Sequence, residues 1–229
     1  MFDSVATWLS AAGDLPAERS IDSPTLGALR REARQRAVAY LRETVDTAYG
    51  VHPLGFLSIP LFASPTQKIL LHLWHPPLFG ASSPFHIHDH SYASFSFILA
   101  GTLRNQVFGE TSMDDADVGE FKIAIATAGT TDTQLRMTDS RVALKRLQDT
   151  SLATGSAYSL GQDVFHYAWP ASETVVTLYF HLLDRASRRT SRVAIPPDLG
   201  NVLPKFEYNL IGRAHRSDLV DLFRTHLQD

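Results

Sequence analysis

The stretch Phe85-His86-Ile87-His88-Asp89-His90 places three of the ten histidines of this chain at alternate positions. A β-strand directs alternate side chains to one face, so on a strand His86, His88 and His90 would project together. The following residues, rich in aromatic, isoleucine and serine side chains, favour a strand over a helix. Clustered imidazoles on a strand face are suitable ligands for a borderline transition metal. The alternative is a polar strand face that carries histidines without a metal.

Composition excludes several classes of protein. The 229 residues can bury a core within one domain, and the net charge of −3 argues against a nucleic-acid-binding surface. The chain has no cysteine, so no disulfide, thiolate ligand or cysteine nucleophile can form. No apolar run approaches the roughly 20 residues of a membrane span. The N-terminus lacks the features of a secretory signal, and we expect a cytoplasmic protein.

Helical signals dominate residues 1–53. Asp3–Ala12 has apolar residues on one face of a short helix. Ser23 and Pro24 predict a second helix, with serine as the N-cap and proline at the first helical position, and Gly50 marks its end. We expect this N-terminal segment to pack on the rest of the protein.

Between residues 54 and 190 the pattern changes to short apolar runs separated by Pro, Gly and Asp clusters. These runs are Lys68–Trp74, Phe95–Val107, Glu120–Ala126, Arg141–Leu147, Ser156–Leu160 and Thr174–Leu182. Their number and spacing predict a mainly β fold, either a sandwich or a barrel. Residues 191–229 follow as an irregular, proline-containing arm and a last helix capped by Ser217.

The histidine segment resembles the first motif of the cupin family, G-x5-H-x-H-x3,4-E-x6-G, and most closely its form in cysteine-dioxygenase-like enzymes. The start of the motif fits residues 80–88, and its end fits residues 88–101 with Ser94 in place of the glutamate. Ile87-His88-Asp89-His90 matches the I-H-D-H form of the thiol dioxygenases, which favours the second register. The resemblance implies a double-stranded β-helix, or jelly-roll barrel.

This resemblance also implies a mononuclear metal centre. In the favoured register His88 and His90 are ligands, and His86 lies beside them as a functional or structural group. The second cupin motif supplies one histidine preceded by glycine, and the stretch from Gly161 to His166 fits it. The implied ligand set is therefore His88, His90 and His166, with open positions for substrate or oxygen.

Three absences qualify the resemblance. The glutamate of the motif is missing, and Asp89 on a regular strand would face away from the metal and orient a neighbour instead. The cysteine that some members cross-link to a tyrosine is missing too. The family's substrate-binding arginine has no counterpart in residues 57–67, and Lys68 is the nearest cation. A small amino-acid thiol is therefore not the expected substrate.

Several other residues are candidates for proton transfer or hydrogen bonding. His181 lies near the position of the family's active-site tyrosine, and imidazole suits acid/base work near neutral pH. Four tyrosines could each donate a hydrogen bond to bound oxygen: Tyr92, Tyr158, Tyr167 and Tyr179. The candidate catalytic residues are His181, Tyr179, Tyr92 and His86. The histidines expected at the surface are His52, His215 and His226.

The predicted function is a mononuclear non-haem Fe(II) oxygenase that acts with O2 on a small, partly apolar molecule. The first alternative is a redox-neutral cupin with zinc, manganese or nickel that works as an isomerase, lyase or bond-forming enzyme. The second alternative is a ligand-binding cupin without turnover. The expected partners are the small-molecule substrate and O2, with neither nucleic acid nor membrane. A homodimer is expected by analogy with other cupins.

Overall fold

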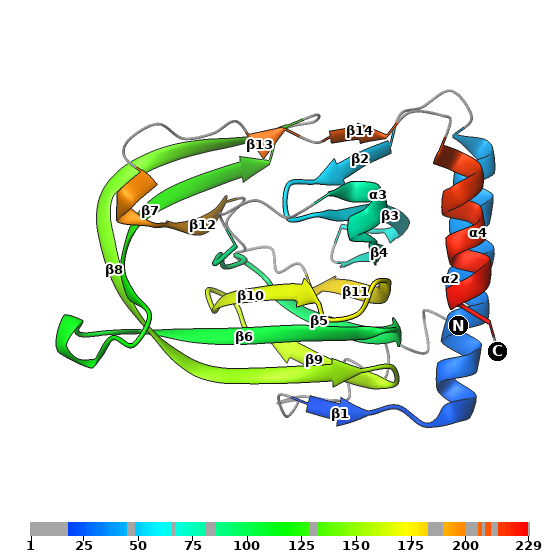
Figure 1. Ribbon diagram of the computed structural model, residues 1–229, viewed down its shortest axis with the longest axis horizontal. Helices are drawn as coiled ribbons and strands as arrows, with labels where there is room; N and C mark the ends of the chain where they lie inside the picture. Colours follow the sequence, from blue (N-terminus) through cyan, green and yellow to red (C-terminus); the bar gives the residue numbers. More distant parts are fainter. Residues whose placement is uncertain are drawn as a thin grey trace.

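The computed structural model of this chain describes residues 18–44, 49–65, 67–80, 86–128, 132–182, 190–199, 206–207, 209–211 and 215–228. Its strands form two curled antiparallel sheets, with helices packed against one of them (Figure 1). The predicted mainly β fold with an N-terminal helix and a C-terminal helix is confirmed. The short helix predicted at residues 3–12 lies outside the described residues.

Sheet A contains eight strands within the described ranges, and sheet B contains six. The spatial order in sheet A is β1 (Glu18–Ser20), β9 (Ser156–Leu160), β5 (Ala93–Ala100), β11 (Val175–Leu182), β4 (Gln67–Trp74), β3 (Phe56–Ala63), β2 (Tyr49–His52) and β14 (Asn209–Ile211). The order in sheet B is β10 (Phe165–Pro170), β6 (Thr102–Thr111), β8 (Asp132–Ala153), β7 (Gly119–Ala128) and β12 (Thr190–Ile195), and β13 (Phe206–Glu207) pairs with β8.

Both sheets extend beyond the predicted limits of the barrel at residues 54 and 190. Strands β1 and β2 join sheet A from the N-terminal segment, and β12 joins sheet B by pairing with β7. In the C-terminal arm, β13 pairs with β8 of sheet B and β14 pairs with β2 of sheet A. The arm therefore contacts both sheets through main-chain hydrogen bonds.

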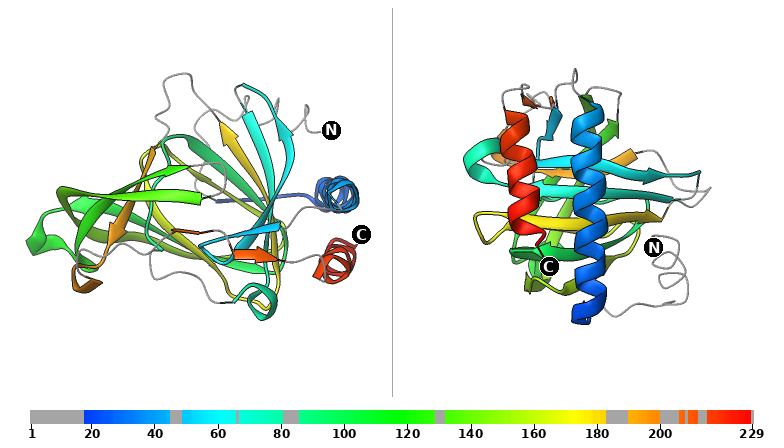
Figure 2. Two further views of the ribbon diagram at one scale, coloured as in Figure 1. Left: turned by 90° about the horizontal axis from the view of Figure 1, so that it is seen from above. Right: turned by 90° about the vertical axis from the view of Figure 1, so that its right-hand side faces the viewer.

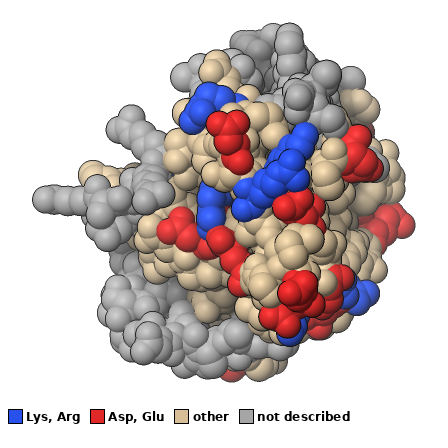
Figure 3. All heavy atoms as spheres, turned by 90° about the vertical axis from the view of Figure 1, so that its left-hand side faces the viewer, with Lys and Arg blue, Asp and Glu red and all other residues tan. Residues whose placement is uncertain are grey.

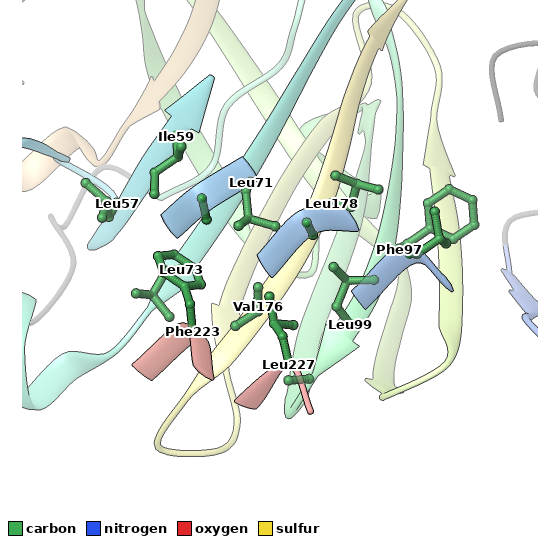
Figure 4. Close-up of a cluster of buried hydrophobic side chains, with 14 of the residues drawn as sticks. Leu57, Ile59, Leu71, Leu73, Phe97, Leu99, Val176, Leu178, Phe223 and Leu227 are labelled. Carbon is green, nitrogen blue, oxygen red and sulfur yellow. The ribbon is translucent and has the colours of Figure 1, made fainter. Parts of the chain in front are cut away.

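Alternate residues of sheet A face different surroundings. Along β4, Leu71 and Leu73 are fully buried in the apolar core between the sheet and the helices. Figure 4 shows this face, with leucine, isoleucine, valine and phenylalanine side chains of the strands gathered around Phe223 and Leu227. His72 and Trp74 are also buried but lie on the opposite face. One face of sheet A thus carries the apolar core, and the other carries polar and aromatic side chains.

Helix α2 (Ser23–Glu43) begins and ends at other residues than predicted. Asp22, not Ser23, is the N-cap, because its carboxylate accepts hydrogen bonds from both the N–H and the hydroxyl of Thr25. The helix ends at Thr44, whose N–H and hydroxyl both donate to the carbonyl four residues earlier. The helix therefore ends well before Gly50, which lies in β2.

Helices α2 and α4 lie side by side on the outer face of sheet A (Figure 2). The buried residues of α2 are spaced four apart and form one stripe: Leu29, Ala33, Ala37 and Leu41. Helix α4 (Arg216–His226) begins before Ser217 and buries Leu219 and Phe223. The remaining short helices are α3 (Pro76–Phe79) and two 3-10 turns, Met113–Asp115 and Pro197–Leu199.

The run predicted from Phe95 to Val107 consists of two strands, β5 and β6, joined at Gly101. Gly101 has a φ of +79°, and a Cβ atom there would lie 2.1 Å from the carbonyl oxygen of Thr174. Only glycine fits this tight reversal, which directs the chain from sheet A into sheet B.

No helix in the described part of the chain is long and apolar enough to cross a membrane. On the face shown in Figure 3, acidic and basic side chains are intermingled. Ion pairs within sheet B include Arg141–Glu120 and Arg104–Asp149.

The packing of α4 on sheet A predicts the effect of truncating Phe223. Its side chain is fully buried, so Phe223→Ala should lower the free energy of unfolding by about 3 to 5 kcal/mol. The control is Leu147→Ala on β8, where the side chain is 65% exposed and the loss should stay within about 0.5 kcal/mol. Urea denaturation measures both, and equal losses would contradict this account of the core.

Candidate metal centre

The histidine segment lies between β10 and β12, and the predicted regular strand from His86 is not formed. The His88 N–H donates to the His166 carbonyl (3.1 Å), and the His166 N–H donates back to the His88 carbonyl (2.8 Å). On the other side, the Asp89 N–H donates to the Arg192 carbonyl (2.9 Å). The segment is therefore held by isolated β-bridges and not by continuous strand pairing. Regular strand pairing begins only at Ala93.

Three imidazoles converge at this point. The ligand atoms of His88, His90 and His166 all lie within 4.8 Å of one another. The ring centroids of His88 and His166 are 4.4 Å apart, and that of His90 lies 4.8 Å from His88 and 5.0 Å from His166. His166 is 5% exposed, and the other two are half-buried. This arrangement could hold one metal ion.

Backbone carbonyls determine which ring nitrogen of two histidines is free. His88 Nδ1 lies 2.8 Å from the His86 carbonyl oxygen, and His166 Nδ1 lies 3.1 Å from the Val164 carbonyl oxygen. Because a carbonyl only accepts hydrogen bonds, each Nδ1 must donate, which leaves the Nε2 lone pair for a metal. Burial lowers the pKa of His166 to about 3 and also lowers the pKa of His88. Both rings are therefore neutral, as metal binding requires.

The convergent group contains no carboxylate among the described residues. Asp89, between two of the histidines, is 1% exposed, and its carboxylate accepts hydrogen bonds from Arg192. A divalent ion at this site would therefore be held by three neutral nitrogen ligands. Such a set suits iron, zinc, nickel or manganese without choosing among them.

His86 does not join the other three histidines. Its ring stacks on Tyr167, with centroids 4.5 Å apart and planes 23° apart. Its buried Nδ1 has no hydrogen-bond partner within the described residues. Its carbonyl oxygen instead accepts the hydrogen bond from His88. The structure therefore gives the His86 main chain a role in orienting a ligand, and its catalytic role stays a prediction.

The other three candidate catalytic residues lie beside His90. The ring of Tyr92 stacks on His90 (4.9 Å) and, more closely, on His181 (4.3 Å). The Tyr92 hydroxyl and His181 Nε2 are 3.4 Å apart. The Tyr179 ring lies 6.3 Å from His90 and 4.9 Å from His181. Strand β11 carries both Tyr179 and His181, two residues apart and so on one face.

Burial determines the charge of these groups. It lowers the pKa of His181 to about 3, with a further contribution from Lys68. A neutral imidazole with so low a pKa serves near pH 7 as a hydrogen-bonding group, because it is too weak a base to carry a proton efficiently. Burial, followed by the neighbouring Tyr92, raises the pKa of Tyr179 well above its usual range, so this hydroxyl keeps its proton.

Two further histidines belong to the same interior. His52, expected at the surface, lies in β2 and stacks on Phe56 (4.5 Å), which in turn contacts His72 (4.4 Å). His72 stacks on Tyr179 (4.9 Å), so these rings connect His52 to the neighbourhood of His90. The sequence could have indicated the inward position of His72, because His72 lies two residues before Trp74 and so on the same face of β4. No local pattern marks His52, because its neighbours come from other strands.

Unpartnered polar atoms line the inward face of sheet A. They are Trp74 Nε1 and Thr177 Oγ1, both buried and without a hydrogen-bond partner within the described residues. Thr177 is fully buried and pairs with His72 in the ladder between β11 and β4. Buried polar groups are nearly always hydrogen-bonded in native proteins. These atoms are therefore suited to contact a bound molecule or water.

No protein-family description matches the sequence, and no curated protein sequence is similar to it. Similar solved structures include an oxalate decarboxylase from Lactobacillus farciminis (10% identity, TM-score 0.36), with 60% of this chain and 30% of that chain covered. A cupin superfamily protein from Desulfitobacterium hafniense is 12% identical (TM-score 0.33), and the match covers 56% of this chain and 78% of that chain. A hydroquinone 1,2-dioxygenase in complex with Cd2+ and 4-hydroxybenzonitrile is 13% identical (TM-score 0.36), and the match covers 68% of this chain and 78% of that chain. These similarities are too distant to assign an activity.

The ligand geometry predicts which histidines bind metal. His88→Ala and His166→Ala should each remove stoichiometric binding of Co(II) or Fe(II), because two nitrogen ligands hold a divalent ion far more weakly than three. Far-UV circular dichroism should show the same β content in both variants. His215→Ala, an exposed histidine before α4, is the matched control and should bind one equivalent. Full metal occupancy in both site variants would contradict the assignment.

The half-buried His52 predicts acid sensitivity of the metal-free protein. Burial, followed by the neighbouring His88, lowers the pKa of His52 to about 3, against about 6.5 in an unfolded chain. Between these values the unfolded chain binds a proton that the folded chain does not, so stability falls as the pH decreases. His52→Gln should therefore reduce the slope of unfolding free energy against pH, between about pH 6 and 4, by up to about 1.4 kcal/mol per unit. Urea titrations measure the slope, His215→Gln should leave it unchanged, and an unchanged slope in His52→Gln would contradict the expected shift.

Proposed function

We propose that this protein is a mononuclear metal-dependent cupin enzyme, a non-haem Fe(II) oxygenase that acts with O2 on a small, partly apolar molecule. The observation that carries the proposal is the convergence of His88, His90 and His166, two of them oriented by backbone carbonyls so that Nε2 is free. The resemblance of the I-H-D-H segment to thiol dioxygenases supports O2 chemistry at this site.

Iron held by three histidines would keep coordination positions for substrate and O2 and would mediate the transfer of electrons from the substrate to O2. The donor set fits such an ion because its imidazoles are neutral and converge on one point. The residues of the chain then act around it. Tyr179, whose buried hydroxyl keeps its proton, donates a hydrogen bond toward the bound ligand. The stacked rings of Tyr92 and His181 exclude water on one side of His90.

The interior also bears on the class of substrate. Trp74 and Thr177 offer uncharged hydrogen-bonding atoms, and aromatic rings surround them. The chain has no cysteine for a cross-link, and residues 57–67 lack an arginine for a carboxylate. We therefore favour a small molecule with an apolar portion and uncharged polar groups over an amino-acid thiol.

The neutral ligand set also supports the second candidate, a redox-neutral cupin with zinc, manganese or nickel. Three neutral ligands leave the full charge of a divalent ion available as a Lewis acid for isomerase, lyase or bond-forming chemistry. A ligand-binding cupin without turnover is the third candidate. The homodimer expected from other cupins remains a proposal.

Nitric oxide, an O2 analogue, tests the oxygenase proposal without knowledge of the substrate. Protein purified anaerobically is analysed for metal, loaded with Fe(II) and exposed to nitric oxide. We expect one iron per chain and the EPR signal of an iron nitrosyl, because three histidines leave positions open. His88→Ala is the control and should give no such signal. Tightly held zinc that iron does not replace, with no nitrosyl signal, would contradict the oxygenase and favour the redox-neutral enzyme.

A further inference from the structure

The side chain of Arg192 on β12 is bound to the residue between two of the metal-site histidines. The Arg192 N–H and Nε donate to the two carboxylate oxygens of Asp89 at 2.6 and 2.5 Å. The Asp89 N–H donates back to the Arg192 carbonyl oxygen. Asp89 is 1% exposed, and a buried carboxylate without its partner is strongly destabilising. This pairing therefore resists any shift of His88 and His90 along β12.

The same guanidinium reaches the segment that leads to the third histidine. Arg192 Nη2 donates to the Asp163 carbonyl oxygen (3.2 Å), and the guanidinium lies over the Phe165 ring, 4.5 Å from its centroid. The Asp163 N–H in turn donates to the His90 carbonyl oxygen (2.8 Å). Asp163 is the one non-glycine residue with positive φ (59°) in the described part of the chain. Arg192 therefore contacts both segments that carry the metal-site histidines.

The fourth contact of Arg192 is an ion pair with an exposed residue. Arg192 Nη1 donates to Glu110 on β6 at 2.7 Å, but the Glu110 side chain is 53% exposed. Exposed ion pairs contribute little to stability, so this contact mainly orients the planar guanidinium. It offers a control that removes one partner of Arg192 without touching either histidine segment.

From these contacts we propose that Arg192 is a positioning residue for the metal centre, and the proposal rests on the metal site proposed above. Arg192 touches none of the three imidazoles. Through Asp89 it fixes the segment of His88 and His90, and through Asp163 and Phe165 it fixes the approach to His166. The planar fork of arginine meets Asp89 and Asp163 at once, which the single ammonium group of lysine cannot reproduce.

The test compares Co(II) binding by wild type, Arg192→Lys and Asp89→Asn. Affinity is measured by competition with a chromophoric chelator, geometry by the visible spectrum of the Co(II) form, and folding by thermal unfolding of the metal-free protein. We expect both variants to lose about 10- to 100-fold in Co(II) affinity and to change the Co(II) spectrum. The double variant should lose no more affinity than the single variant that binds Co(II) more weakly, because the two substitutions disrupt the same contact between Arg192 and Asp89.

Two controls separate positioning from general destabilisation. Glu110→Gln removes the exposed partner, and Arg141→Lys weakens an ion pair elsewhere in sheet B, so both should bind Co(II) within about twofold of wild type. A lower unfolding temperature of Arg192→Lys with unchanged Co(II) affinity and spectrum would overturn the proposal. If Arg192→Lys does not fold, unchanged binding by Asp89→Asn overturns it equally. Failure of the wild type to bind Co(II) would refute the metal centre itself, which is a distinct result.

Discussion

The reciprocal main-chain hydrogen bonds between His88 and His166 are the constraint on which the site depends. They join two segments 78 positions apart in the sequence and bring their imidazole centroids within 4.4 Å of each other, with the ring planes tilted by 50°. The same bonds place His88 between β10 and β12, so the histidine segment connects the two edge strands of sheet B. The centre is thus part of the hydrogen bonding that closes this sheet, and the ligand positions are determined together with the fold.

Sheet A lies opposite the histidine segment, and the side chains of its strands alternate between the helices and the interior. Leucines and isoleucines face α2 and α4, and the residues between them face the interior. Because the helices already supply the apolar core, the interior face is free to carry histidine, tyrosine, threonine and tryptophan side chains. The buried imidazoles there remain neutral, since burial lowers the pKa of His52 and His181 to about 3. A divalent ion would accordingly be the main charge in this interior.

The alternation of side chains along a strand predicted much of this arrangement from the sequence. It gave the bounds of β4 and β9 to within one residue and placed His88 and His90 on the same side of their segment. The alternation of a regular strand does not extend to His86, because this residue precedes the first paired residue of its segment. The predicted helix start was one residue late because the Asp22 carboxylate, and not the Ser23 hydroxyl, caps the first turn. Arg192 left no local signal, because its partner Asp89 lies 103 positions away in the sequence.

The central claim is that one metal ion binds Nε2 of His88, His90 and His166. A crystal structure of the metal-loaded protein, with anomalous diffraction at the absorption edge of the metal, tests it most directly. The account predicts a single anomalous peak about 2.0 to 2.2 Å from the three Nε2 atoms, with Nδ1 of His88 and His166 still bound to backbone carbonyls. A metal bound elsewhere, or coordinated through Nδ1 of His88 or His166, would contradict it.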